Sequence, residues 1–309
     1  MIIVYRLLCQ DRCPSTIVYR LPTIVQMLKS ISHVATAVSE PIADLQTYRA
    51  FPTRETGDVN PFLFLNHHGF QVYPPENNGL PFGPHPHKGF ETLTFVFDGE
   101  VAHMDSTGEA FVTGPGGVQW MTAGSGIVHA EVSPESFRKA GGPLEIIQIW
   151  MNLPAALKRS TPWYRGLDAE ELTVEEGAGW RWTIVSGETQ AGAQGPVDSM
   201  TGLFMSSLTL EGEARFETTI PANRTLMLYV VRGAVQVNGV DLRKHDLPQF
   251  GAEGEELSII ATADSLVLLC HGAPIDEPVV AHGPFVMNSA AEIHEAIEEY
   301  QAGKFGMIR

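Results

Sequence analysis

The chain has 309 residues and a formal net charge of −16, from 36 acidic and 20 basic residues. A field of that sign repels nucleic-acid phosphates and anionic lipid, so direct binding to nucleic acid or to a membrane surface is disfavoured. No run reaches the roughly eighteen apolar residues that a spanning helix needs, which argues against a membrane protein of that kind. The apolar content of 44% and charged content of 18% are typical of a globular protein with a buried core.

The first 26 residues differ in composition from the rest, with three arginines and one aspartate among scattered apolar residues. Asp11, Arg12 and Pro14 interrupt any continuous apolar core, which argues against a secretory signal. We interpret residues 1–26 as a disordered or mis-called extension, with Met27 as the natural start.

The cysteines predict a reducing location. Cys9, Cys13 and Cys270 are the full set, and the first two lie in the extension, so no disulfide framework can form. We therefore expect a cytoplasmic protein.

Residues 42–153 are a succession of short apolar runs separated by glycine, proline and asparagine, without a sustained helical period. This pattern predicts an all-β structure. Residues 92–97 and 144–151 are expected strands, and turns at 98–99 and 106–108 suggest that hairpins follow one another.

A short segment of the chain occurs twice. Residues 95–101 (FVFDGEV) reappear as residues 229–235 (YVVRGAV), and Asn238-Gly239 then closes a predicted hairpin. A repeat of this kind predicts two copies of one β-module. We place the first domain at residues 27–165 and the second at 166–309, and we expect the Gly-rich residues 187–196 to form a loop between the two structured halves.

The chain ends in its clearest predicted helix. Ser289 can cap its N-terminus and Glu292 completes a capping box, while Gly303 suits a C-terminal cap. The acidic outer side, which includes Glu299, is interpreted as a solvated face.

The segment from Gly83 to Glu91 (GPHPHKGFE) is the most informative for chemistry. On an extended chain, residues two apart point to the same face, so His85 and His87 can converge on one ion. Glu91 stands at an even offset and can share that face. Neutral imidazole is a good ligand for iron, zinc, copper, nickel and manganese.

A second pair stands at His129 and Glu131, again two residues apart after a Gly-rich turn. Two strand-borne pairs facing each other would supply three imidazoles and one carboxylate, with coordination positions left open. This is a catalytic type of metal site. Glu91 remains open as an alternative ligand, as a group that orients a ligand, or as a carboxylate hydrogen-bonded near the end of the strand.

The other histidines are weaker candidates. His67 and His68 adjoin Gly69 in a predicted turn and, being adjacent, would face opposite ways. His103 either lines the cavity or faces solvent. Five more are isolated and are expected to be structural or exposed: His33, His245, His271, His282 and His294.

The repeat also predicts which module lacks the metal. We aligned the two copies by placing Gly99 on Gly233. In this alignment, the positions of His85, His87 and Glu91 are taken by Thr219, Pro221 and Thr225. The second module should therefore be structural.

Four segments together resemble the pirin family of the cupin superfamily, from about Ser39 to the C-terminus. They are residues 85–92 (HPHKGFET), 118–124 (VQWMTAG), 126–131 (GIVHAE) and 283–288 (GPFVMN). The resemblance implies two cupin barrels (double-stranded β-helix or jelly-roll folds) packed together, followed by a short C-terminal helix. It implies one metal, usually Fe(2+), in the N-terminal barrel, although other transition metals fit as well. It implies the ligands His85, His87, His129 and Glu131, whereas the general cupin pattern would use Glu91.

Some pirins resemble quercetin 2,3-dioxygenases, which implies an oxidoreductase acting on a flavonol or another small aromatic substrate with dioxygen. In such an enzyme Glu131 is a possible base for the flavonol 3-hydroxyl, after which dioxygen attacks the ring and carbon monoxide leaves. Other pirins imply the alternative, a metal-dependent co-regulator that acts on transcription or metabolism through a regulatory protein partner.

Overall fold

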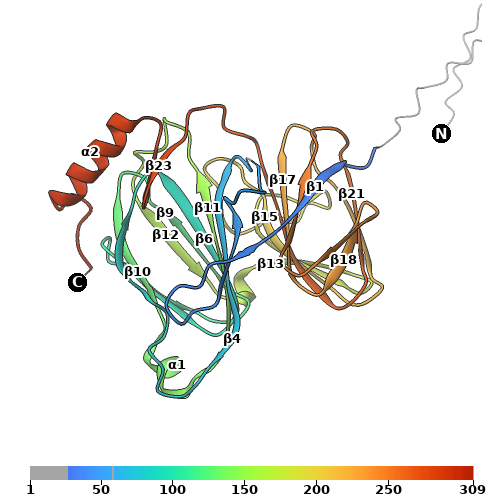
Figure 1. The fold of residues 1–309 in the computed structure, drawn as a ribbon, viewed down its shortest axis with the longest axis horizontal. Helices are drawn as coiled ribbons and strands as arrows, with labels where there is room; N and C mark the ends of the chain where they lie inside the picture. Colours follow the sequence, from blue (N-terminus) through green and yellow to red (C-terminus); the bar gives the residue numbers. More distant parts are fainter. Residues whose placement is uncertain (1–26, 58, 309) are drawn as a thin grey trace, which may run out of the picture.

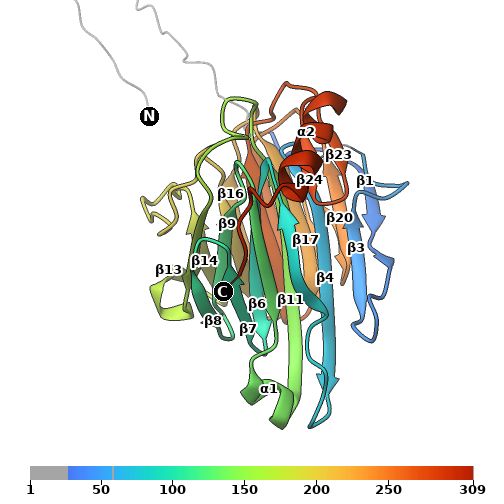
Figure 2. The ribbon, with the colours of Figure 1, turned by 90° about the vertical axis from the view of Figure 1, so that its left-hand side faces the viewer.

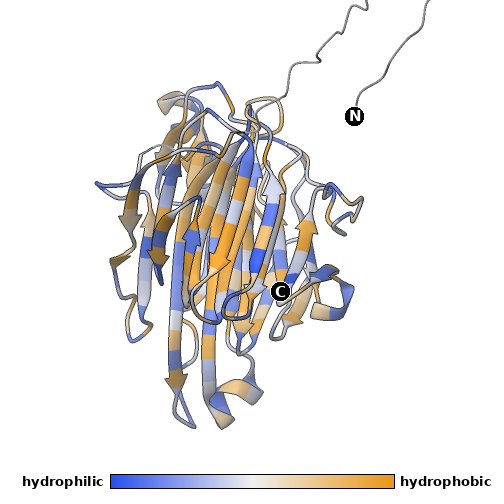
Figure 3. Ribbon diagram, turned by 90° about the vertical axis from the view of Figure 1, so that its right-hand side faces the viewer, coloured by the Kyte–Doolittle hydropathy of each residue, from blue (hydrophilic) through white to orange (hydrophobic). Residues whose placement is uncertain are grey.

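The computed structural model describes residues 27–57 and 59–308, so the prediction made for residues 1–26 lies outside the described part. Two β-barrels stand side by side, and the longer helix covers the outer end of the first barrel (Figure 1). Apolar and polar residues alternate along many strands (Figure 3), as expected for strands with one face toward a core and the other toward solvent. Within the described ranges, no helix has the length and apolar character needed to cross a bilayer.

The first barrel consists of a seven-stranded and a four-stranded antiparallel sheet, with strand orders β12-β9-β6-β11-β4-β3-β2 and β5-β10-β7-β8. The short helix α1 (Glu135–Ala140) joins β10 to β11. The strands are β2 (Val38–Ser39), β3 (Thr47–Phe51), β4 (Phe62–Tyr73), β5 (Phe82–His87), β6 (Phe90–Asp98), β7 (Val101–Asp105), β8 (Ala110–Thr113), β9 (Val118–Thr122), β10 (Ile127–Val132), β11 (Gly142–Asn152) and β12 (Trp163–Leu167).

The second barrel consists of a five-stranded sheet, β13-β14-β15-β22-β17, and a four-stranded sheet, β16-β21-β18-β19. The N-terminal β1 (Ile31–Thr36) pairs with β20 (Asp246–Phe250) of this half. A 3-10 turn, η1 (Ala169–Glu171), precedes β13. The remaining strands are β13 (Thr173–Gly177), β14 (Trp180–Ser186), β15 (Met205–Leu210), β16 (Arg215–Thr219), β17 (Thr225–Arg232), β18 (Ala234–Val237), β19 (Val240–Arg243), β21 (Glu256–Ala261) and β22 (Ser265–Gly272).

The strand orders confirm that the chain contains two copies of one module. The neighbours β6-β11-β4 in the first barrel correspond to β17-β22-β15 in the second, and β5-β10-β7-β8 corresponds to β16-β21-β18-β19. The predicted all-β fold with two cupin barrels is therefore confirmed. The boundary that we placed between residues 165 and 166 stays a prediction.

Two local predictions were wrong in their connections. Asp98-Gly99 does not close a hairpin, because both neighbours of β6 in its sheet are other strands, β9 and β11, and the turn instead carries the chain across to β7 in the opposite sheet. Residues 187–196 join β14 to β15 within one sheet rather than separating the two halves. The hairpin at Asn238-Gly239 is confirmed by the pairing of Val237 with Val240, and both turn residues have positive φ, as a tight hairpin requires.

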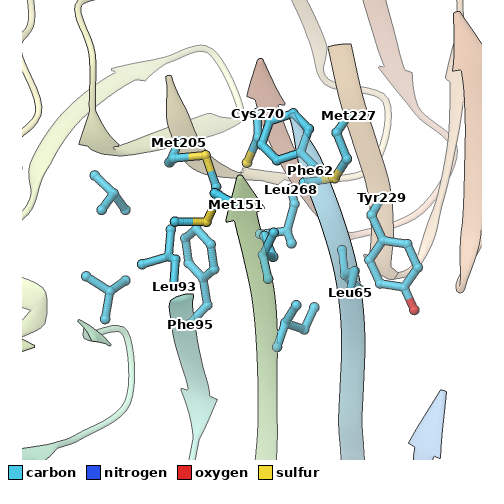
Figure 4. Packing of buried hydrophobic residues seen from close by; sticks show 14 of the residues in the cluster. Phe62, Leu65, Leu93, Phe95, Met151, Met205, Met227, Tyr229, Leu268 and Cys270 are labelled. Atoms are coloured by element: carbon cyan, nitrogen blue, oxygen red, sulfur yellow. The ribbon is translucent and has the colours of Figure 1, made fainter. Parts of the chain in front are cut away.

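The large sheets of the two barrels share one apolar core (Figure 4). The shift that places Phe95 on Tyr229 also places Leu93 on Met227, and all four side chains are buried in this core. Equivalent faces of the two copies therefore pack against each other. Because burial of one large apolar side chain contributes about 1.5–3 kcal/mol, this layer is a main source of cohesion between the barrels.

After the second barrel the chain returns to the first. It forms the hairpin of β23 (Val280–His282) and β24 (Phe285–Met287), and then α2 (Ala290–Gln301), which lies over the end of the first barrel (Figure 2). The predicted cap at Ser289 is confirmed, since its side chain accepts a hydrogen bond from the Glu292 backbone nitrogen. Ile293 and Ala296 bury the inner face of the helix.

Candidate metal centre

Strand pairing brings the histidines of the two sequence segments together. His85 and His87 lie on β5, and His129 lies on the neighbouring β10, directly opposite His85 in the register. Because His85 and His87 are two residues apart on a strand, both rings can face the same side. The arrangement therefore follows from the pairing of two short strands.

The three imidazoles form a tight group. Their candidate ligand nitrogens all lie within 4.8 Å of one another, and no second group of this kind occurs in residues 27–57 and 59–308. The Nε2 atoms of His85 and His129 are 2.9 Å apart. Two ring nitrogens at this separation can be bridged by a proton or by a metal cation.

Backbone carbonyls orient two of the rings. Nδ1 of His85 donates to the Gly83 carbonyl at 2.7 Å, and Nδ1 of His87 lies 3.4 Å from the Pro284 carbonyl. In these tautomers Nε2 is left as the ligating atom, which is how metal-bound histidines are commonly held. His129 contributes a buried Nδ1 that has no hydrogen-bond partner among the described residues.

Burial keeps the rings of His87 and His129 uncharged. It lowers the pKa of His87 to about 3, with a further contribution from nearby His85. Burial, followed by the neighbouring histidines, lowers the pKa of His129 well below its ordinary value. Neutral imidazole is the form that binds metal, so the three residues fit a transition-metal ion.

Glu131 lies on β10 beside this group without belonging to it. Its two carboxylate oxygens accept hydrogen bonds from the Thr94 hydroxyl at 3.1 Å and from the Gln148 amide at 2.6 Å. The cluster of ligand atoms within 4.8 Å contains the three histidines alone. The role of Glu131 as a fourth ligand stays a prediction.

Glu91 occupies a separate buried position. One of its oxygens accepts hydrogen bonds from Trp120 at 3.1 Å and from Thr122 at 2.6 Å. The other oxygen is buried without a partner in the described part of the chain. Burial raises the pKa of Glu91 despite these two bonds. Its role as an alternative ligand or as an orienting group also stays a prediction.

Three further histidines are buried. His103 stacks on Tyr164 with ring centroids 3.7 Å apart, and its centroid lies 5.4 Å from that of His129. The alternative that His103 faces solvent is therefore wrong. The turn predicted at His67 and His68 is also wrong, because β4 runs through both residues and pairs with β3 and β11 on its two sides.

An aromatic wall beside the histidines was not predicted. Trp150 on β11 lies 5.2 Å from His87, 4.6 Å from Phe64 and 4.5 Å from Phe90, measured between ring centroids. The available signal was the alternation of Gln148 and Trp150 on one strand face, which becomes informative only once the partner strands are known.

The C-terminal segment is fastened to the strand that carries the histidines. The buried Lys88 donates to Glu299 of α2 at 2.5 Å and to the Ser125 carbonyl at 2.8 Å. Lys158 donates to the carbonyls of Gly89 at 2.9 Å and Val286 at 3.1 Å. The prediction of a solvated acidic side on α2 holds for the exposed Glu295 and Glu298. It is wrong for Glu299, because this residue pairs with Lys88 next to His87.

Comparison with known proteins agrees with the fold. The family model described as pirin matches residues 44–151, and the model described as the pirin C-terminal cupin domain matches residues 205–306. A Pseudomonas aeruginosa protein, named as a candidate quercetin 2,3-dioxygenase, is 37% identical over 250 residues, which cover 80% of this chain and 87% of that protein.

Two solved structures extend the comparison. Quercetin 2,3-dioxygenase from Acinetobacter baumannii has a TM-score of 0.84 and 32% identity, and the match covers 92% of this chain and all of that one. The Escherichia coli bacterial pirin YhhW, in complex with nickel(II), has a TM-score of 0.60 and 25% identity, covering 79% of this chain and 99% of that one. The chain therefore belongs to the pirin family, as a protein with two cupin barrels.

Proposed function

We propose that this protein is an Fe(2+)-dependent oxidoreductase of the quercetin 2,3-dioxygenase type, with a flavonol and dioxygen as substrates. The observation that carries the proposal is the group of three converging histidines in one barrel of a pirin-family chain. The name of the Acinetobacter relative supports the reaction type. The choice of iron comes from the family resemblance, and the nickel in the YhhW complex makes metal identity part of the test.

In this proposal the ion is held by His85, His87 and His129, with Glu131 as the proposed fourth ligand. When bound, the metal supplies positive charge that stabilises an ionised hydroxyl and the redox capacity for dioxygen chemistry. In the aromatic wall, the half-buried Phe64 and Trp150, packed on the buried Phe90, offer ring surface against which a planar flavonol can pack.

Glu131 is the proposed proton acceptor for the flavonol 3-hydroxyl. Thr94 and Gln148 both donate to its carboxylate, and Gln148 is itself held by the Trp150 indole nitrogen at 3.1 Å. This chain of donors fixes the carboxylate in one orientation, which a general base needs.

Elemental analysis of protein purified without added metal, followed by aerobic incubation with quercetin, tests the proposal. We expect about one equivalent of iron, loss of the flavonol absorbance and release of carbon monoxide. The variant His129→Ala should lose both metal and turnover, whereas His294→Ala on the exposed side of α2 should keep both. Absence of turnover with iron, nickel, manganese or cobalt would remove the proposed reaction for this substrate.

The alternative role, a metal-dependent co-regulator, stays a prediction. Pull-down of partner proteins with the parent chain and with His85→Ala tests it directly. An identical set of partners would count against metal-controlled binding.

A further inference from the structure

The second barrel contains a cavity of about 370 Å³ that the proposed reaction does not use. Its size is within the range of about 300–1,000 Å³ that is typical of small-molecule sites. Its lining includes Trp182, Phe204, Thr219, Glu255 and His271. Apolar ring surface and a few converging polar groups are therefore present together, which is the usual composition of a ligand site.

Strand register shows that this cavity stands where the first barrel has its metal centre. In the first barrel, Trp150 pairs with Phe64 on β4 and with Thr92 on β6. In the second, His271 pairs in the same way with Phe204 and with Leu226 on β17. His271 therefore occupies the position of Trp150.

The ring stack of the first site is kept in the second. Phe64 and Trp150 stack with centroids 4.6 Å apart and an interplanar angle of 22°, and Phe204 and His271 stack at 4.7 Å and 3°. The metal ligands are not kept, because Thr219 and Pro221 stand where the repeat places His85 and His87. Both residues line the cavity. The second module thus retains the stacked ring pair beside a cavity, without the histidines of the first module.

His271 presents one defined hydrogen-bond donor. The Arg224 Nε atom donates to Nδ1 of His271 at 2.6 Å. Because arginine can only donate, Nδ1 must accept and the ring proton must reside on Nε2. That Nε2–H has no hydrogen-bond partner within the described ranges. Burial, followed by the charges of Arg224 and Lys29, lowers the pKa of His271 to about 3, so the donor is uncharged at neutral pH.

The charged side chains that line the cavity are both acidic, while the cations Arg224 and Lys29 lie outside the lining, near His271. Two exposed carboxylates, Glu188 and Glu255, contribute to its lining, and no lysine or arginine does. An anionic ligand would meet these carboxylates, whereas hydroxyl groups could donate to them. The required ligand has a planar ring, an oxygen that accepts from His271, hydroxyl donors and no net negative charge.

We infer that the cavity of the second barrel is a binding site for an uncharged phenolic carbonyl compound of one or two rings. The carbonyl oxygen accepts from Nε2 of His271, the ring packs beside Phe204 and Trp182, and a phenolic hydroxyl donates to Glu188 or Glu255. This site is separate from the metal centre and does not depend on catalysis there.

A matched pair of probes tests this site by isothermal titration calorimetry on protein freed of metal. 4-Hydroxyacetophenone carries the neutral carbonyl, and 4-hydroxybenzoate replaces it by a carboxylate of similar size. We expect one equivalent of the ketone to bind and the benzoate to bind at least tenfold more weakly. The substitution Glu188→Gln, at an exposed residue, should reduce the difference in affinity between the ketone and the benzoate.

Variants locate the bound probe. His271→Phe keeps a ring beside Phe204 and removes the donor, so affinity for the ketone should fall about tenfold, as for one lost hydrogen bond. His85→Ala and the surface control His294→Phe should bind as the parent does. Circular dichroism and thermal unfolding establish that each variant is folded. If His271→Phe does not fold, the affinities measured with Glu188→Gln test the location of the site instead.

Three results would overturn the inference. The first is no binding of the ketone to the parent at millimolar concentration. The second is affinity that depends on His85 and not on His271, which would place the probe in the first barrel. The third is benzoate binding as tightly as the ketone, which would contradict the selection by charge. None of these results bears on quercetin turnover, so the two proposals fail independently.

Discussion

In the proposed reaction, Thr94 and Gln148 position the Glu131 carboxylate, to which both donate hydrogen bonds. Removing the Thr94 hydroxyl in Thr94→Val deletes one donor to Glu131 while leaving the three histidines in place. We expect kcat for quercetin to fall about tenfold, within the 10²–10⁴-fold total that a general base contributes, with little change in KM or metal content. Thr94→Ser should restore activity. Thr92→Val on the same strand is the matched control, and an equal loss there would contradict the assignment.

His68 should make the protein sensitive to acid. The ring is buried and bonded to the Thr47 hydroxyl at 2.8 Å, and burial, followed by the charges of His67 and Arg49, lowers its pKa to about 3. The unfolded chain binds a proton near pH 6.5 and the folded chain does not, so stability is complete above that pH and is lost as pH falls toward 3.

The loss amounts to as much as about 1.4 kcal/mol per pH unit, or roughly 2 kcal/mol between pH 6.5 and 5. Urea unfolding of metal-free protein across this interval measures the slope. The variant His68→Gln should be less stable at pH 7 and show a flatter dependence on pH. A slope identical to that of the parent would mean that other groups dominate.

Among the site residues, the histidines could be predicted and their surroundings could not. His85, His87 and His129 follow from spacing on a strand, because a period of two fixes which side chains share a face. The environments of Glu131 and Glu91 depend on hydroxyl and amide donors from other strands. The Pro284 carbonyl beside His87 comes from the far end of the chain, and no local pattern signals such a contact.

Helix α2 is fastened by an ion pair whose removal should loosen the metal centre. Glu299→Gln removes the carboxylate that faces the buried Lys88. We expect the free energy of unfolding to fall by about 1–2 kcal/mol, less than for a fully buried pair because Glu299 is 18% exposed.

Hydrogen exchange of α2 and of residues 84–88, together with metal affinity by competition with a chelator, measures this coupling. Exchange should rise in both segments, and metal affinity should fall. Glu298→Gln, one residue away on the exposed side, is the control. If both variants behave as the parent does, the pair is not an anchor.

At the level of strands and helices, the sequence was informative wherever a signal was local. Ser289 capped its helix and Asn238-Gly239 closed its hairpin, as their short-range chemistry requires. The turn at Asp98-Gly99 was assigned to the wrong connection. A tight turn has the same sequence pattern whether it joins two paired strands or carries the chain from one sheet to the other. The pairing of β1 with β20 joins opposite ends of the chain, and alternation alone does not choose between distant partners.

The two barrels are joined by a buried polar network as well as by their apolar core. Glu145 of the first barrel, fully buried, lies 3.0 Å from His67 and also pairs with Arg232 of the second. Burial alone would raise the pKa of Glu145, but the bonds and charges of His67 and Arg232 lower it.

The variant Glu145→Gln removes the charged partner of His67 and one of the two carboxylates that pair with Arg232, since Asp98 remains. We expect about 1–2 kcal/mol of destabilisation, less than for a fully buried pair because Arg232 is 41% exposed. Denaturant unfolding should change from one transition to two as the barrels lose their coupling. Glu109→Gln on the surface is the control, and a single transition with an unchanged midpoint would contradict a role in cohesion.

The internal repeat made the two-module organisation of the molecule predictable from a seven-residue echo. The way in which the modules pack was not predictable. Any arrangement of two barrels would bury apolar residues at their contact, so an apolar pattern does not indicate which faces meet. The structure adds that Leu93 with Met227, and Phe95 with Tyr229, occupy equivalent places in one shared layer.

The ion pair between Asp98 and Arg232 has a consequence for the symmetry of the molecule. These residues hold the same position in the two repeats and touch each other, so they lie on the axis that relates the copies. In a dimer of two identical chains, a residue on that axis meets only itself, and two aspartates or two arginines would repel. A pair of opposite charges there requires two independently mutable positions. The attraction between Asp98 and Arg232 is therefore one that two copies of a single identical module could not make.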